Sequence, residues 1–204
     1  YLSFNTFYSK EKGSFIETYL AVSGASAKFV KNKNGKFQAS IEISLSFSQD
    51  SVVKFKDRYN LLSQELNDTA NVNFNFLDQQ RINLPNGTYT FKMGIVDNNN
   101  KKEPFEAENK VVLNYNDSSF AISDIQLSES FKKSENESIT SKSGYEMVPY
   151  VNNFYPKDVN TLNFYAEIYN SDKALNAEPF LVKYFIESYS KKLPIAELSA
   201  FSKQ

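Results

Sequence analysis

Hydrophobic and polar residues alternate along much of the chain, and the clearest run covers residues 37–48. Its apolar positions are Phe37, Ala39, Ile41, Ile43, Leu45 and Phe47, and Gln, Ser or Glu stands between them. A period of two predicts a strand with one face in a core and the other in water. The preceding pair Asn34-Gly35 favours a tight turn, so residues 27–30 are predicted to be the partner strand.

The same pattern returns several times, separated by turn signals. A second hairpin is predicted around Pro85-Asn86-Gly87, with residues 72–84 before the turn and 89–95 after it. Strands of this length and spacing are typical of a β-sandwich. The other predicted strands are 16–22, 52–62, 105–115, 120–127, 162–168, 180–186 and a segment within 194–201.

The polar stretch 114–119 divides the pattern into two units, 1–116 and 117–204. We predict an all-β fold of tandem immunoglobulin-like antiparallel β-sandwich modules. Tyr89 stands where such a module often has a tyrosine that bonds back across a corner, although an ordinary buried tyrosine is an equal alternative. The second unit has no closing hairpin, so either the chain is truncated or this unit is a smaller sandwich. An open sheet edge there would be a pairing site for another chain.

Composition narrows the chemistry that the chain is able to perform. The chain has 204 residues, no Cys and no His, and a formal net charge of −1. These absences exclude His-based triads, His-ligated metals and Cys-based zinc sites. Arg58 and Arg81 are the only arginines, which disfavours a nucleic-acid binder, and no apolar run approaches the roughly 20 residues of a membrane-spanning helix.

Carboxylate chemistry, lysine chemistry and oxygen-ligated metals are the remaining options. A pair of acidic residues is what a glycosidase needs, but most of the acidic residues sit at outward positions of predicted strands, where a solvated charge is expected. Residues 97–100 lack the spacing of a dedicated calcium loop, so a polar turn is the favoured interpretation. The acidic residues considered are Glu17, Glu42, Asp78, Glu167 and Glu187.

The segment 145–169 is rich in Tyr and Asn, and it provides the candidate binding residues. Exposed tyrosines beside asparagines can form a sugar platform or a protein-binding surface, whereas buried ones fill the core and its rim. The latter interpretation is favoured. The candidates are Tyr145, Tyr150, Tyr155, Tyr165 and Tyr169.

Four segments in this order resemble the N-terminal region of the GWxTD-domain proteins of Bacteroidota. They are residues 73–89, 123–127, 143–156 and 164–170. The resemblance implies an exported cell-envelope protein, in the periplasm or at the outer membrane, whose signal peptide has been removed and whose sandwich modules precede a C-terminal domain. The Gly-Trp-x-Thr-Asp motif that names the family is absent, because the chain has no Trp.

The sequence therefore predicts a non-catalytic envelope scaffold or protein-docking module without a cofactor. Its expected partners are other envelope proteins or a C-terminal part of the same chain. The alternative hypothesis is a carbohydrate-binding module that uses the tyrosines of the segment 145–169. A carboxylate enzyme is the third hypothesis, and it requires two acidic side chains that face each other across one cleft.

Overall fold

The computed structural model describes residues 1–100, 103–136, 138–152 and 154–186. Antiparallel strands make up nearly all of its regular structure, as the alternating pattern predicts. An all-β fold is therefore confirmed, while the immunoglobulin-like assignment stays a prediction.

The first unit is a sandwich of two antiparallel sheets that share one core. The three-stranded sheet has the order β1-β2-β7, and the four-stranded sheet has the order β6-β5-β8-β9. The bounds are β1 Leu2–Ser9, β2 Gly13–Ser23, β5 Ser40–Gln49, β6 Val52–Leu62, β7 Asn75–Asn83, β8 Gly87–Asp97 and β9 Phe105–Leu113.

Strand β5 shows why the sequence forms this sandwich. The apolar side chains of β5 are buried on one face, and its serines are half-buried on the other face. Because successive side chains of a strand point to opposite faces, one face of β5 is shielded from water. The rings of Phe47 and Phe91 stack at 4.6 Å between neighbouring strands, and Phe4 of the opposite sheet meets Phe91 edge-on at 5.9 Å. Aromatic contacts of this kind join the two sheets into one core.

The predicted hairpin around Pro85-Asn86-Gly87 is wrong, because this turn joins the two sheets. β7 pairs with β2, whereas β8 pairs with β5 and β9. Tyr89 at the start of β8 is buried, and its hydroxyl donates a 2.7 Å hydrogen bond to the carbonyl of Pro85. That bond back across the corner holds the crossing between the sheets, as the tyrosine-corner hypothesis proposed.

Two short elements interrupt the first unit. The turn at Gly35, with φ +72°, joins β3 Val30–Lys31 to β4 Phe37–Gln38, so the predicted partner strand 27–30 is shifted towards the turn. The segment η1 Gly24–Ser26 is a single 3-10 turn that follows β2.

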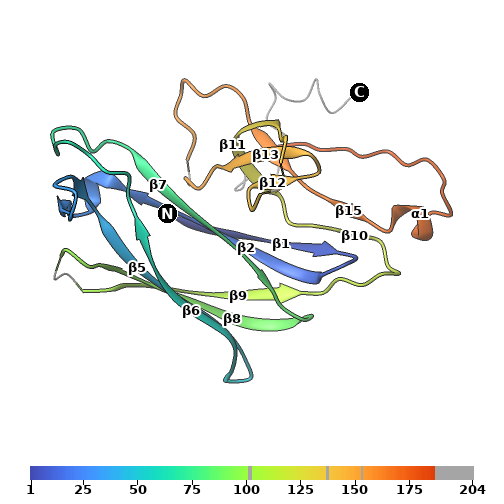
Figure 1. Ribbon diagram of the computed structural model, residues 1–204. Helices are drawn as coiled ribbons and strands as arrows, with labels where there is room; N and C mark the ends of the chain where they lie inside the picture. The colour runs from blue at the N-terminus through green and yellow to red at the C-terminus, as the bar shows by residue number, and fades with distance from the viewer. Residues whose placement is uncertain (101–102, 137, 153, 187–204) are drawn as a thin grey trace.

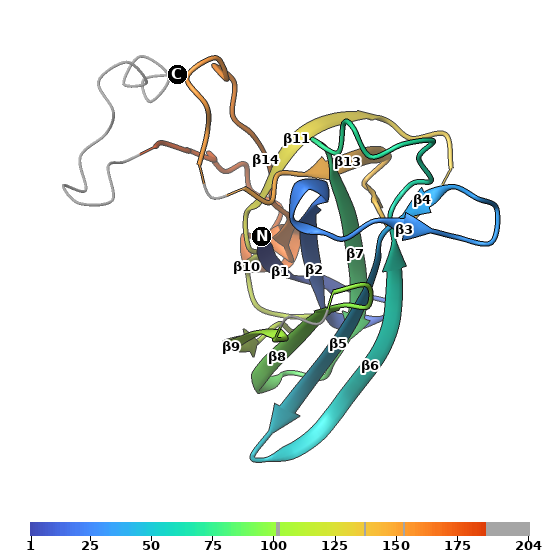
Figure 2. The same cartoon turned by 90° about the vertical axis from the view of Figure 1, so that its left-hand side faces the viewer.

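The second unit contains a four-stranded sheet of order β12-β13-β11-β14 and a separate pair β10-β15. Figure 1 shows the sheet β1-β2-β7 lying between the four-stranded sheet of the first unit and the second unit, and Figure 2 shows the same layers from the side. The bounds are β10 Ala121–Ile122, β11 Gln126–Lys133, β12 Ser141–Lys142, β13 Tyr145–Pro149, β14 Asn163–Tyr165, β15 Ile168–Tyr169 and α1 Ser171–Ala174.

The predictions for the end of the chain are partly wrong. Residues 180–186 are not a strand, and the predicted strand 162–168 is divided into β14 and β15. Alternation alone does not make a strand, since each strand needs a neighbour to satisfy its backbone groups. The predicted segment within 194–201 lies outside the described residues.

Candidate functional site

A buried charge network joins the two units, and Glu17 lies at its centre. The sequence predicts that most of the acidic residues considered, Glu17 among them, sit at outward positions where a charge is solvated. Glu17 does not fit that expectation, since it is 0% exposed. The second unit covers the outward face of the sheet β1-β2-β7 at this point, which a period of two cannot reveal. Asp78 is also buried, where it accepts a 2.6 Å hydrogen bond from the hydroxyl of Tyr59.

Two cations neutralise the Glu17 carboxylate, one from each unit. Arg81 of β7 lies 2.7 Å from Oε1, and Lys142 of β12 lies 2.5 Å from Oε2. Tyr19 donates a 2.6 Å hydrogen bond to Oε2, and Lys142 also donates to the side-chain oxygen of Gln126. A buried charge is tolerated only when it is paired and hydrogen-bonded in this way.

Burial changes the proton affinity of groups in this network. Desolvation lowers the pKa of Lys142 below its usual range, and the Glu17 carboxylate opposes that change. Desolvation raises the pKa of Tyr19, and the neighbouring carboxylate of Glu17 raises it further. The ammonium of Lys142 also lies 4.0 Å from the ring centre of Phe7, a favourable cation–π distance.

A second set of polar contacts extends the junction along β1. Both the backbone N–H and the hydroxyl of Thr6 donate to the Asp124 carboxylate, at 2.8 Å and 2.7 Å. The N–H of Tyr8 donates to the hydroxyl of Tyr169 at 3.0 Å. These bonds link residues that are more than 100 positions apart, so they fix the second unit onto the first.

The structure divides the five candidate tyrosines among three places. Tyr165 and Tyr169 belong to the junction, and both hydroxyls donate to Glu167 at 2.6 Å. Tyr150 and Tyr155 stack on each other at 4.2 Å between ring centres. Tyr145 is exposed and packs edge-on against Phe131. The five rings therefore do not form one platform.

Large exposed hydrophobic side chains are more numerous in the second unit than in the first, and in the second unit they lie between residues 120 and 185. β14 is the end strand of its sheet, and no strand pairs with its outer side in the described part of the chain. Leu162 and Phe164 are 38% and 42% exposed at this edge, and Tyr184 packs edge-on against Phe164. The sequence predicts an open edge in this unit but does not identify the strand.

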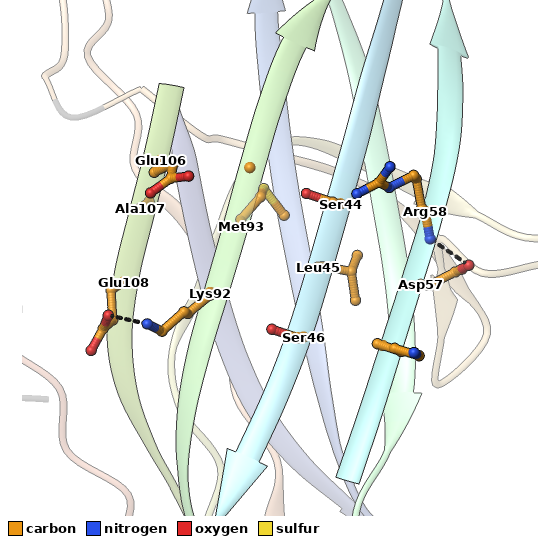
Figure 3. A pocket seen from close by; sticks show the side chains of 12 residues that line it. Ser44, Leu45, Ser46, Asp57, Arg58, Lys92, Met93, Glu106, Ala107 and Glu108 are labelled. Atoms are coloured by element: carbon orange, nitrogen blue, oxygen red, sulfur yellow. Dashed lines mark hydrogen bonds and ion pairs between the residues drawn. The ribbon is translucent and has the colours of Figure 1, made fainter. Parts of the chain in front are cut away.

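A polar groove lies on the outward face of the sheet β6-β5-β8-β9 (Figure 3). Its volume is about 670 Å³, and its floor includes Ser44, Ser46 and Gly94. Arg58 stands on one side, and the ion pair of Lys92 with Glu108, 3.0 Å apart, stands on the other. The small serine side chains at successive outward positions of β5 are the sequence feature that indicates this shallow groove, which was not predicted.

The described residues offer little to a metal ion. They contain no group of three or more Asp, Glu, His or Cys side chains that could hold one. Asp97 belongs to the segment 97–100, which was considered as a calcium loop. Its carboxylate accepts hydrogen bonds from the N–H groups of Asn99 and Lys28. Glu42 lies on the surface beside Arg58, and Glu187 lies outside the described residues. None of the helices in the described ranges is long and apolar enough to cross a membrane.

Comparisons with known proteins give no family to which this chain can be assigned. No family model, no curated protein and no solved structure matches it.

Proposed function

We propose that this chain is a non-catalytic protein-docking module of a larger assembly in the cell envelope. The observation that carries the proposal is the number of exposed hydrophobic side chains on the second unit, of which Leu162 and Phe164 lie at the open edge of β14. Exposed apolar patches of this kind are typical of protein–protein interfaces. The envelope location follows from the resemblance to the GWxTD-domain proteins.

The open edge of β14 and the exposed side chains beside it support docking in different ways. Because no strand of the described residues pairs with the outer side of β14, its outward N–H and C=O groups can offer a partner strand backbone hydrogen bonds, which is the mode called β-augmentation. Phe164 and Leu162 offer apolar area, and full burial of such a side chain contributes roughly 1.5–3 kcal/mol. Together they suit a partner that adds an extended segment to the sheet.

The first unit supplies a fixed support for this surface. Glu17, Arg81 and Lys142 hold the second unit against the sheet β1-β2-β7, so the edge of β14 is presented in one orientation. A pre-oriented surface loses less conformational entropy on binding than a mobile one does.

The carbohydrate alternative has less support. The hydroxyls of Tyr165 and Tyr169 are engaged by Glu167, and Tyr150 and Tyr155 cover one face of each other. A sugar platform needs free aromatic faces that lie side by side.

Partner capture with matched variants tests the proposal. Phe164→Asp places a charge on the edge strand β14 of the second unit. Phe105→Asp does the same on β9, an edge strand of the first unit, where Phe105 is 60% exposed. Capture from native envelope extract should be lost with the first variant and kept with the second. Equal capture by both variants, with unchanged melting temperatures, would contradict the proposed surface.

A further inference from the structure

The side chains of Lys142 and Gln126 meet in a buried space at the junction of the two units. Gln126 of β11 is 1% exposed, and the side chain of Lys142 of β12 is 4% exposed. The ammonium group of Lys142 donates a hydrogen bond to Oε1 of Gln126, so it lies against the carbonyl group of the carboxamide. An amine held beside a carboxamide has the atoms needed to form a new amide bond, with ammonia as the leaving group.

The Glu17 carboxylate is placed to carry the protons that such a reaction moves. Its Oε2 atom lies 2.5 Å from Nζ of Lys142, and its Oε1 atom lies 2.7 Å from the Arg81 guanidinium. A general base has to lie within hydrogen-bond reach of the proton that it removes, and Glu17 meets this condition. Arg81 remains as the counter-charge of Glu17 when Lys142 loses its own charge.

The hydroxyl of Tyr19 lies beside the oxygen on which negative charge would develop. It is 3.1 Å from Oε1 of Gln126 and 2.6 Å from Oε2 of Glu17. A hydrogen-bond donor that is already in place at a developing oxyanion lowers the barrier of acyl transfer. Tyr19 therefore supplies the third group that the reaction needs.

The surroundings of Lys142 favour the neutral amine, which is the nucleophilic form. The ring centres of Phe7 and Tyr165 lie 4.0 Å and 5.5 Å from its nitrogen. Desolvation in this space lowers the pKa of Lys142, which raises the fraction of free amine. The same burial excludes water, which would otherwise compete by hydrolysing the carboxamide.

We propose that Lys142 and Gln126 form an intramolecular isopeptide bond, with Glu17 as the catalytic residue. Nζ gives a proton to Glu17 and attacks Cδ of Gln126, which forms the Nζ–Cδ bond. The Cδ–Nε2 bond of the tetrahedral intermediate then breaks. Two protons leave Nζ in all, both reach the departing nitrogen through Glu17, and that nitrogen leaves as ammonium. The ion pair of Glu17 with Lys142 is the state before this bond forms.

Gln126 is the group that is attacked, because an ionised carboxylate resists an amine and two cations hold the charge on Glu17. The new bond joins β12 to β11 across β13, which lies between them in the sheet. It would secure β12, which is an edge strand of two residues, over the junction. The reaction runs once per chain, so it is compatible with a non-catalytic docking module and does not depend on that proposal.

The intact mass of the full chain, measured under denaturing conditions, tests for the bond. We expect a mass lower than that of the sequence by one ammonia molecule. Lys142→Arg should show no loss, because the guanidinium stays protonated and does not attack. Lys132→Arg is the matched control, since Lys132 is an exposed lysine of the same sheet, and it should keep the loss. A full mass for the original chain, or a loss that persists in Lys142→Arg, would overturn the proposal.

Digestion with trypsin locates the bond. Cyclisation of an Asn-Gly pair to a succinimide also releases ammonia, and the chain has such pairs at 34–35 and 86–87. Trypsin cleaves after Lys132 and Lys133 but not after an acylated lysine, so the bond should yield one branched peptide that joins segments 111–132 and 134–157. Separate peptides with unmodified Gln126 would contradict the bond, and a loss of water in place of ammonia would contradict Gln126 as the group attacked.

Tyr19→Phe tests the mechanism apart from the bond, because it keeps the ring and removes only the hydroxyl. Loss of one oxyanion donor slows acyl transfer roughly 100-fold or more. Samples taken at equal times after synthesis should therefore contain less crosslinked chain in this variant than in the original. Equal amounts of crosslinked chain would refute the role assigned to Tyr19.

Discussion

Removing the negative charge of Glu17 should destabilise the chain strongly. The ammonium of Lys142 lies 2.5 Å from the Glu17 carboxylate. Glu17→Gln keeps the shape of the side chain, but it leaves that ammonium buried beside a neutral amide, without its counter-charge. Breaking a buried ion pair by removal of one partner costs about 3–5 kcal/mol. We expect a loss of this size in the free energy of unfolding.

Urea denaturation followed by linear extrapolation measures the effect. Glu42→Gln is the matched control, because Glu42 is half-buried and lies 3.8 Å from the exposed side chain of Arg58. Pairs of this kind contribute about 0–1 kcal/mol. If Glu17→Gln costs no more than Glu42→Gln, the carboxylate is solvated and the second unit does not cover the sheet β1-β2-β7.

A double-mutant cycle isolates the interaction energy between Glu17 and Lys142 from the other effects of each substitution. Lys142→Met alone should cost less than Glu17→Gln, because Arg81 still neutralises the carboxylate at 2.7 Å. The combination Glu17→Gln with Lys142→Met should cost less than the sum of the two single changes, since no unpaired ammonium remains. Strict additivity would show that the two side chains do not interact.

Three further changes probe other parts of the fold. Tyr89→Phe removes the 2.7 Å bond to the Pro85 carbonyl, and urea denaturation should show a loss of about 0.5–1.5 kcal/mol; no loss would mean that the corner is held by packing alone. Gly24→Ala would place a Cβ 2.5 Å from the carbonyl oxygen of Val72, so we expect a loss of about 1–3 kcal/mol and a lower melting temperature, whereas an unchanged melting temperature would contradict this backbone approach. Burial raises the pKa of Tyr169 and of other tyrosines at the junction above the ordinary value of 10.0. The stability that these groups contribute is therefore complete below pH 10, and it is lost as the pH rises towards their folded-state pKa values. Urea denaturation between pH 8 and pH 11 should therefore show stability falling above pH 10, and a rise there would contradict the assignment.

The strands of the four-stranded sheet were largely predictable where one face is buried in the core and the other faces water. β5 is the clearest example, since its burial follows the apolar positions of residues 40–49 one by one. Tyr89 was also identifiable, because a tyrosine shortly after Pro85-Asn86-Gly87 suits a corner. What the pattern did not reveal was the pairing of β7 and β8, which depends on contacts far along the chain.

The junction between the units was not predictable from local pattern. Glu17 occupies an outward position of β2, and the same sequence pattern would fit a solvated glutamate. Its partner Lys142 lies in the polar stretch 132–143, which predicts an exposed loop or a weak edge strand. Lys142 does lie in an edge strand, β12, but its side chain is buried against Phe7. Burial of both depends on how one unit packs on the other, and alternation carries no information on that. The single visible sign was an acidic residue amid the long apolar run of β2.

Residue-specific photo-crosslinking tests the central claim, docking through the second unit, most directly. p-Benzoylphenylalanine in place of Phe164 should give one discrete adduct with a partner protein in native envelopes. The same group in place of Phe105, which is also an exposed edge-strand phenylalanine, should give none. Adducts at position 105 together with none at position 164 would contradict the account.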